Sequence, residues 1–215
     1  MSADLHLFKG EGERFRKYAR FSINPITRTL EIFDHDLFFQ EKKFDQLYGD
    51  IHRQFAPFDN QDYQNSFFQM LVIDSFEALP IPDSLRNQEF EVSAHMIRIE
   101  ATSASSLGRP APEGIHRDGY HFGSIHLMGR ENLIGAENNI YDLEKRLIDT
   151  KTLVEPMDSL YFDDSAIFHG VNPFERVDQN RRGTRDMLIL LYQPLSESPQ
   201  QPAAKRLLRH FSATA

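Results

Sequence analysis

The sequence predicts a mainly β protein with some α structure (α+β). The expected architecture is a double-stranded β-helix, a cupin-like jelly roll, with a helical and mixed N-terminal layer. From about Glu89 onward, short runs rich in β-branched and aromatic residues alternate with turns rich in Gly, Pro and Asp, which is typical of a sandwich or jelly roll. Before that point the pattern is mixed, and one segment has a helical period.

The N-terminal layer contains this one predicted amphipathic helix. Apolar residues fall at helical spacing between Phe44 and Phe55, so we expect a helix over about 41–55, which Pro57 ends. Two further apolar segments, 29–33 and 68–73, are interpreted as strands or as buried pieces of chain.

The β region begins with a long predicted strand over 90–101, followed by a loop rich in Ser, Gly and Pro. Further short strands are predicted at 115–118, 121–128, 139–141, 159–162, 166–169 and 187–193. Pro194 follows the last of them, and the remaining residues are expected to form a tail that is disordered or ends in a short amphipathic helix.

At 215 residues the chain is long enough for one substantial core. We expect a single domain over 1–195, with the mixed layer at 1–90, the double-stranded β-helix at 91–195 and a C-terminal tail at 196–215. No apolar run approaches the roughly 18 residues of a membrane span, and the first residues carry scattered charges instead of the apolar segment of a signal peptide. The expectation is therefore a cytoplasmic protein with no membrane partner.

Composition excludes several classes of site. The chain has no cysteine, which removes disulfides, zinc–thiolate sites, iron–sulfur clusters and cysteine nucleophiles. Any bound metal must therefore be held by nitrogen and oxygen ligands. The net charge of -8 argues against a nucleic-acid partner, because binding to phosphates requires clustered Lys and Arg.

The residues that indicate chemistry lie in the segment 114–119. On an extended strand, residues i and i+2 project from the same face, so His116 and Asp118 can bind one ion. His169, at the end of a later strand, is the candidate third ligand. Two histidines and one carboxylate are the ligand set of non-haem Fe(II) oxygenases, which leaves positions for a co-substrate and O2. We therefore predict that His116, Asp118 and His169 bind Fe(II) and are the catalytic residues.

An H-x-D tripeptide alone is weak, because it occurs by chance in many chains. Here a second histidine ends a later strand, and Arg185 opens the strand after that. Arg185 shares a strand face with Met187, Ile189 and Leu191, so its charge needs an anionic partner. A guanidinium group matches a carboxylate with two hydrogen bonds, and Arg185 is predicted to bind the distal carboxylate of 2-oxoglutarate.

Other arginines compete for such a role. Arg181 and Arg182 lie in a polar turn, where solvated side chains are the simpler interpretation. Arg98 could bind a substrate carboxylate or form an ion pair with a nearby Glu.

The remaining histidines and one acidic pair have simpler interpretations. His121 and His126 fall on opposite faces of their strand and are interpreted as polar or core residues. His95 is interpreted as a packed core residue, and the pair at 163–164 as a turn.

Four segments of the β region form a distinctive set. They are PEGIHRDG at 112–119, LMGREN at 127–132, NIYD at 139–142 and GTRD at 183–186. Together they resemble the bacterial 2-oxoglutarate/Fe(II)-dependent dioxygenases that hydroxylate free amino acids, the isoleucine dioxygenase-like family. The match covers about 91–193, and its run from Pro112 to Asp118 is far more specific than H-x-D alone. One departure is Ala136, at a position where the family has a second glycine before the acidic residue.

The resemblance implies a double-stranded β-helix that uses Fe(II), 2-oxoglutarate and O2. It further implies hydroxylation of an aliphatic C–H bond of a free L-amino acid such as isoleucine, leucine or methionine, with release of succinate and CO2. Iron halogenases of the same fold have a small residue in place of the carboxylate, so Asp118 favours hydroxylation.

A zwitterionic substrate needs a cation for its carboxylate and an acceptor for its ammonium group. Arg98 or Arg117 is predicted for the first role, and Glu137 or Asp142 for the second, although Arg117 lies between two ligands and points away from the metal. Two alternatives stay open: the same chemistry on a peptide or another small metabolite, and a non-catalytic cupin-like metal or ligand sensor. The sequence also leaves a homodimer open.

Overall fold

The computed structural model describes residues 13–44, 47, 49–103, 107–198 and 205–210, the last of these segments by its backbone only. The chain is mainly β, with antiparallel sheets and little helix, which confirms the predicted fold class. The helices of the described residues are α1 (Asn60–Tyr63), α2 (Ser66–Ala78) and a 3-10 turn, η1 (Leu195–Glu197). In the described part of the chain, no helix is both long and apolar enough to cross a membrane.

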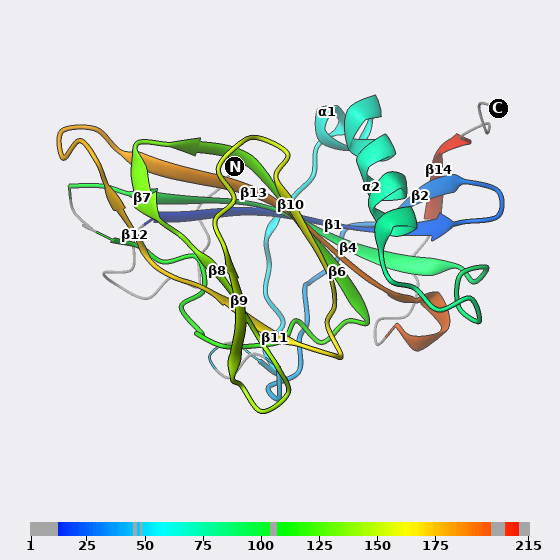
Figure 1. The fold of residues 1–215 in the computed structure, drawn as a ribbon. Coiled ribbons are helices and arrows are strands. Elements are labelled where there is room, and N and C mark those ends of the chain that lie inside the picture. The colour runs from blue at the N-terminus through cyan, green and yellow to red at the C-terminus, as the bar shows by residue number, and fades with distance from the viewer. Residues whose placement is uncertain (1–12, 45–46, 48, 104–106, 199–204, 211–215) are drawn as a thin grey trace.

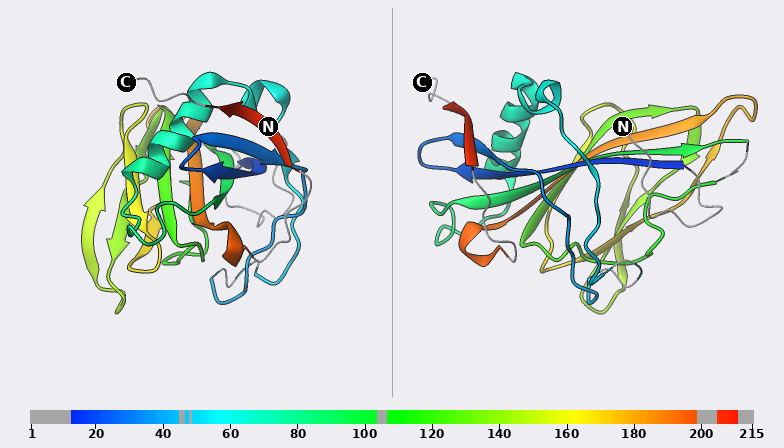
Figure 2. Two further views of the ribbon diagram at one scale, coloured as in Figure 1. Left: turned by 90° about the vertical axis from the view of Figure 1, so that its right-hand side faces the viewer. Right: turned by 180° about the vertical axis from the view of Figure 1, so that it is seen from behind.

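One large sheet runs through the molecule (Figure 1). In spatial order its strands are β10 (Ser159–Asp163), β6 (Phe122–Glu131), β13 (Gly183–Pro194), β4 (Phe90–Ala101), β1 (Glu13–Asn24), β2 (Thr29–Phe33) and β14 (Lys205–His210), with β3 (Ala56–Pro57) beside β1. Figure 2 shows β1 and β2 in blue beside β14 in red, so segments from both ends of the chain pair in this sheet.

Two small sheets complete the β structure. One contains β11 (Phe168–Val171), β8 (Asn138–Tyr141) and β9 (Leu147–Lys151). The other contains β5 (Leu107–Gly108), β12 (Phe174–Arg176) and β7 (Leu133–Gly135).

The two faces of the large sheet have different partners. On one face, the even-numbered residues of β4 and β13, such as Val92 and Leu190, pack against α2 through Val72 and Phe76. Burying large apolar side chains of this kind is the main stabilising contribution to such a core. On the other face, residues such as Ile97 and Ile99 pack toward β7 and β12. The odd-numbered side chains of β4 and β13 therefore point into the space between the large sheet and the small ones.

Several predicted elements were wrong. The described residues within 41–55 form turns and an isolated bridge between Phe38 and Arg53, and no helix. The helix lies instead at α2, where an almost continuous apolar run includes the segment 68–73; such a run does not distinguish helix from strand. Asn65 caps α2 by accepting hydrogen bonds from the backbone of Phe67 and Phe68.

Two further corrections concern the β region and the tail. The segment 115–118 makes a single bridge at His116 and is not a continuous strand. Residues 205–210 of the tail form β14, which pairs with β2, in place of disorder or a helix. The rest of the predicted tail, 199–204 and 211–215, lies outside the described residues.

Ala136, the departure noted in the sequence, is buried and has a φ of 62°. Glycine adopts this left-handed backbone at much lower cost than alanine. The conformation explains why a second glycine suits this position.

Candidate active site

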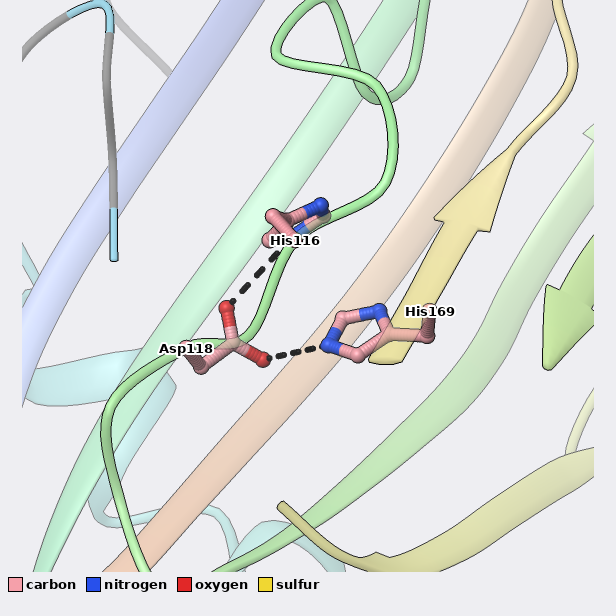
Figure 3. Close-up of side chains that lie close together, drawn as sticks. All are labelled: His116, Asp118 and His169. Carbon is pink, nitrogen blue, oxygen red and sulfur yellow. Dashed lines mark ion pairs between the residues drawn. The ribbon is translucent and has the colours of Figure 1, made fainter. Parts of the chain in front are cut away.

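The structure brings His116, Asp118 and His169 together (Figure 3). One ligand atom from each lies within 4.8 Å of the others. The Asp118 carboxylate lies between the two rings: Oδ2 is 3.2 Å from His169 Nε2, and Oδ1 is 3.8 Å from His116 Nε2. Two nitrogen donors and one oxygen donor thus converge on one point.

A single backbone bridge causes this convergence. The N–H of His116 donates to the carbonyl of His169, and the N–H of His169 donates to the carbonyl of His116, both at 2.9 Å. The bridge holds the loop that carries His116 against β11. Gly114 and Gly119 border the segment with φ values of 78° and 85°, which glycine adopts without steric cost.

The nitrogen atoms of both histidines are oriented as metal binding requires. His116 Nδ1 donates to the carbonyl of Gly114 at 2.9 Å, which leaves Nε2 to face the carboxylates of Glu113 and Asp118, at 3.3 and 3.8 Å. Metal-binding histidines usually have such a partner on the other ring nitrogen. The Nε2 atom of His169 is buried and makes no hydrogen bond with the described residues.

Two residues that the sequence did not single out hold Asp118 in place. The fully buried carboxylate of Asp164 accepts hydrogen bonds from the backbone N–H groups of Asp118 at 3.0 Å and Gly119 at 2.8 Å. Gln40 donates from Nε2 to the Asp118 carbonyl at 2.8 Å. Asp164 does begin a turn, as predicted, but its side chain points inward, which the interpretation of 163–164 as a turn did not include.

The charges of the cluster are mutually dependent. Burial acts to raise the pKa of Asp118, but the His169 and His116 side chains outweigh it and hold that pKa below its ordinary value. Burial acts to lower the pKa of His169, and the Asp118 carboxylate raises it above its ordinary value. Burial, together with the nearby charge of Asp118, raises the pKa of Asp164 to about 6.

A cavity opens beside the three side chains. Its lining contains His116, Asp118 and His169, polar side chains such as Gln40 and Asn138, and an aliphatic wall. The wall consists of Ile97, Ile99, Ile125, Val171, Met187, Ile189 and Leu191. Five arginines and one further carboxylate also line the cavity: Arg14, Arg16, Arg53, Arg109, Arg185 and Glu113.

Arg185 faces this cavity from β13, on the same face as Met187, as its strand phase predicted. Its side chain is buried, Nη2 donates to Asn138 Oδ1 at 3.3 Å, and Nε makes no hydrogen bond with the described residues. Burial, with the charge of Arg130 nearby, lowers its pKa to about 10, so the guanidinium stays charged at neutral pH. No carboxylate of the described residues forms an ion pair with it, which leaves a buried cation directed at the cavity.

The structure places the three predicted substrate contacts elsewhere. Arg98 lies on the opposite face of β4 and forms a two-point ion pair with Asp186, at 2.6 and 2.7 Å. Glu137 accepts a hydrogen bond from Asn172, and Asp142 pairs with Arg146 in an exposed turn. None of the three lines the cavity. For Arg98, strand phase could not show which face of β4 the cavity occupies.

The other candidates are also away from the cavity. Arg181 and Arg182 are exposed and pair with Glu131 and Glu100, as solvated turn residues do. The guanidinium of Arg117 lies over the ring of Phe168, away from the cavity.

Two of the remaining histidines are buried. His126 lies on the α2 side of the sheet, within hydrogen-bonding distance of Ser75, Ser124 and Ser159. His95 is also buried, as predicted, but its side chain lines the cavity.

The comparisons with known proteins show the family of this chain. The family model described as 2OG-Fe dioxygenase matches residues 1–191, most of the chain. The chain belongs to the 2OG-Fe dioxygenase family. This dioxygenase therefore uses Fe(II), 2-oxoglutarate and O2. A search of curated proteins gave no significant match.

Solved structures share the fold of this dioxygenase. A bsmA homolog from Methylobium petroleophilum PM1 is 28% identical, with a TM-score of 0.81 over 94% of this chain and 79% of that chain. IDO from Bacillus thuringiensis is 21% identical, with a TM-score of 0.69 over 85% of this chain and 75% of that one. The Fe(II)/(alpha)ketoglutarate-dependent dioxygenase TqaL is 17% identical, with a TM-score of 0.66 over 90% of this chain and 74% of that one.

The residues of this dioxygenase fit the groups that its family uses. The donor set of two imidazoles and one carboxylate suits Fe(II). The buried guanidinium of Arg185, with its unpaired Nε, suits a carboxylate of 2-oxoglutarate.

Proposed function

We propose that this dioxygenase hydroxylates an aliphatic C–H bond of a free L-amino acid of the isoleucine, leucine or methionine type, producing succinate and CO2. The observation that carries the proposal is the aliphatic wall of the cavity, which lies beside His116, Asp118 and His169. A wall of Ile, Val, Leu and Met side chains suits an aliphatic side chain presented for oxidation. The resemblance of the four sequence segments to free amino acid hydroxylases supports the same substrate class.

His116, Asp118 and His169 hold the metal. Fe(II), with 2-oxoglutarate and O2, supplies the oxidising chemistry, and the protein contributes binding, orientation and exclusion of water. The backbone bridge between His116 and His169 fixes the separation of the two rings before metal binds. Asp164 and Gln40 fix the backbone that carries Asp118, so little ordering is required of the ligands.

Arg185 binds the 5-carboxylate of 2-oxoglutarate. Its buried Nε lacks a hydrogen-bond partner among the described residues, and a carboxylate can accept from Nε and one terminal nitrogen at once. Asn138 accepts a hydrogen bond from Nη2 of the same guanidinium group through Oδ1. Because the site is buried, this charged contact is screened little by solvent.

The substrate's side chain lies against the aliphatic wall, and its ammonium group donates a hydrogen bond to the carboxylate of Glu113. The carboxylate of Glu113 lines the cavity, and its Oε1 atom is 3.3 Å from His116 Nε2, so it lies next to the metal ligands. It replaces Glu137 and Asp142, which the structure places outside the cavity. The apolar wall excludes water from the site, which protects a strongly oxidising centre from side reactions.

Mass spectrometry tests the proposal. The purified enzyme is incubated with Fe(II), 2-oxoglutarate and O2 and with each of the twenty free amino acids. We expect a gain of one oxygen atom in at least one aliphatic amino acid, together with an equivalent of succinate. Omission of 2-oxoglutarate and the Asp118→Ala variant are the controls.

If 2-oxoglutarate is converted to succinate while no amino acid gains oxygen, the free amino acid proposal fails and the oxygenase chemistry stands. A peptide or another small metabolite is then the next substrate class to test.

A further inference from the structure

The cavity contains more positive charge than the metal and the co-substrate require. With Asp118 assigned to the metal and Arg185 to 2-oxoglutarate, the remaining charged lining residues are four arginines and one carboxylate: Arg14, Arg16, Arg53, Arg109 and Glu113. A cationic cleft with apolar walls concentrates anions and strengthens their binding. A substrate that presents an anionic group therefore fits this cavity better than a neutral or cationic one.

We propose that Arg14 and Arg16 of β1 form the subsite that binds the carboxylate of the substrate. The inference rests on the proposed function, because it names where the head group of that substrate lies. It assigns a substrate-binding role to the N-terminal strand, in place of the roles that the sequence suggested for Arg98 and Arg117.

The position of β1 directs both side chains into the cavity. Residues i and i+2 of a strand face the same side, and both arginines line the cavity. Arg14 pairs with Ile99 of β4, and Ile99 pairs with Arg185 of β13. Arg14 and Arg185 thus lie in one row of the sheet, two strands apart, which corresponds to about 10 Å between their backbones. This spacing gives the co-substrate and the substrate separate arginines.

The guanidinium of Arg16 is ordered by contacts with His95 and Phe55. Its Nε and Nη2 atoms lie 3.2 and 2.9 Å from His95 Nδ1, and the guanidinium stacks over the ring of Phe55 at 4.3 Å. Burial and the neighbouring arginines, Arg16 first among them, hold the pKa of His95 well below its ordinary value, so His95 accepts from Arg16 without adding charge. An ordered guanidinium loses less conformational entropy when a carboxylate binds.

Arg14 has unused hydrogen-bonding capacity. Nη1 donates to the carbonyl of Pro110 at 3.3 Å, and the buried Nε makes no hydrogen bond with the described residues. A buried donor without an acceptor is costly, and a bound carboxylate removes the cost. Arg14 resembles Arg185 in this respect, because Arg185 also has a buried Nε without an acceptor.

Binding measurements test the subsite without turnover. The enzyme is loaded with Fe(II) and saturating 2-oxoglutarate under anaerobic conditions, so that Arg185 is occupied. Calorimetry then compares two pairs of probes, L-leucine with L-leucinamide and 4-methylpentanoate with 4-methylpentanamide. The variants are Arg14→Gln, Arg16→Gln and Arg16→Lys. Arg181→Gln, an exposed arginine outside the cavity, is the matched control.

We expect the wild type and Arg181→Gln to bind each carboxylate at least about tenfold more tightly than its amide, as a charge-assisted hydrogen bond predicts. Arg14→Gln and Arg16→Gln should each reduce this preference to within about threefold. The preference of Arg16→Lys should lie between those of the wild type and Arg16→Gln. Thermal unfolding of each variant verifies the fold. If Arg16→Gln does not fold, Arg14→Gln and Arg16→Lys still decide the question.

Equal binding of carboxylate and amide by the wild type would overturn the subsite, as would a full carboxylate preference in the folded glutamine variants. These outcomes are distinct from failure of the proposed function, because that failure is an absence of oxygen gain during turnover. A carboxylate preference that depends on Arg14 and Arg16, found with an enzyme that oxidises no free amino acid, would support the subsite and direct the search to other carboxylic acids.

Discussion

Asp164 and Asp118, two acidic residues 46 positions apart, are joined by a hydrogen bond from the Asp118 backbone N–H to the Asp164 carboxylate at 3.0 Å. The second oxygen of the same carboxylate accepts from the N–H of Gly119 at 2.8 Å. The turn after β10 therefore fixes the loop that carries two of the three candidate metal ligands.

Substitution of Asp164 tests this positioning role. In Asp164→Asn, the amide can present only one oxygen to the two N–H donors, so the Asp118 loop loses part of its anchor. We expect Fe(II) affinity to fall by about 10- to 100-fold, as for other residues that orient metal ligands. Fe(II) titration of the anaerobic protein measures the change.

Asp163→Asn is the matched control, because the Asp163 carboxylate accepts its hydrogen bonds from Ser165 of the same turn. Equal Fe(II) affinity in the two variants would refute the role of Asp164.

The candidate metal site could be predicted from the sequence because two of its three residues are close together in the chain. The spacing of His116 and Asp118 needs only an extended backbone, and the structure supplies that backbone through one bridge to His169. Strand phase alone showed that Arg185 shares a face with Met187, and the structure shows that this face lines the cavity. Asp164 was not recognised because Asp–Asp in a turn is common, and only the tertiary fold shows which of the two side chains points inward.

The arginines of β1 could not be assigned from the sequence for a related reason. Arg14 and Arg16 reach the cavity because β1 pairs with β4 in the large sheet, and long-range strand pairing leaves no local signal. The prediction of a helix at 41–55 was wrong, because the apolar residues between Phe44 and Phe55 match a helical period only by coincidence. Phe55 packs against Tyr18 and Phe38 in a small aromatic cluster and belongs to no helix.

Loss of the Arg185 side chain should weaken co-substrate binding. Arg185→Gln removes the buried charge that faces the cavity, and we expect the KM for 2-oxoglutarate to rise by about 100-fold, the effect of losing a buried charge-assisted pair. Initial rates of succinate formation at varied 2-oxoglutarate concentration give the value. Arg182→Gln serves as the control, since Arg182 is exposed and pairs with Glu100. An unchanged KM in Arg185→Gln would show that the 5-carboxylate binds elsewhere.

His126 should make the fold sensitive to acid. Burial lowers its pKa from 6.5 to about 4, so the folded protein keeps the ring neutral while the unfolded chain binds a proton below about pH 6.5. The unfolded state then binds more protons, and stability falls as the pH drops from about 6.5 toward 4. We expect the wild type to lose on the order of 2 kcal/mol more free energy of unfolding than His126→Gln between about pH 7 and pH 4.5.

Urea unfolding at the two pH values measures this difference. His121→Gln is the control, because His121 is more exposed, precedes β6 and lies beside Glu197. An equal decrease in the free energy of unfolding of the wild type and His126→Gln between the two pH values would contradict a neutral, buried His126.

We infer that His116, Asp118 and His169 form the iron centre of this 2-oxoglutarate-dependent dioxygenase. The most direct measurement is succinate formed from 2-oxoglutarate by the wild type, His116→Ala and Asp118→Ala, with Fe(II) and O2 supplied and the fold of each variant verified by its unfolding temperature. We expect succinate from the wild type and a loss of at least about 100-fold in both folded variants, because each removes one of three candidate metal ligands. Succinate formation at the wild-type rate in either variant would show that these residues do not hold the metal.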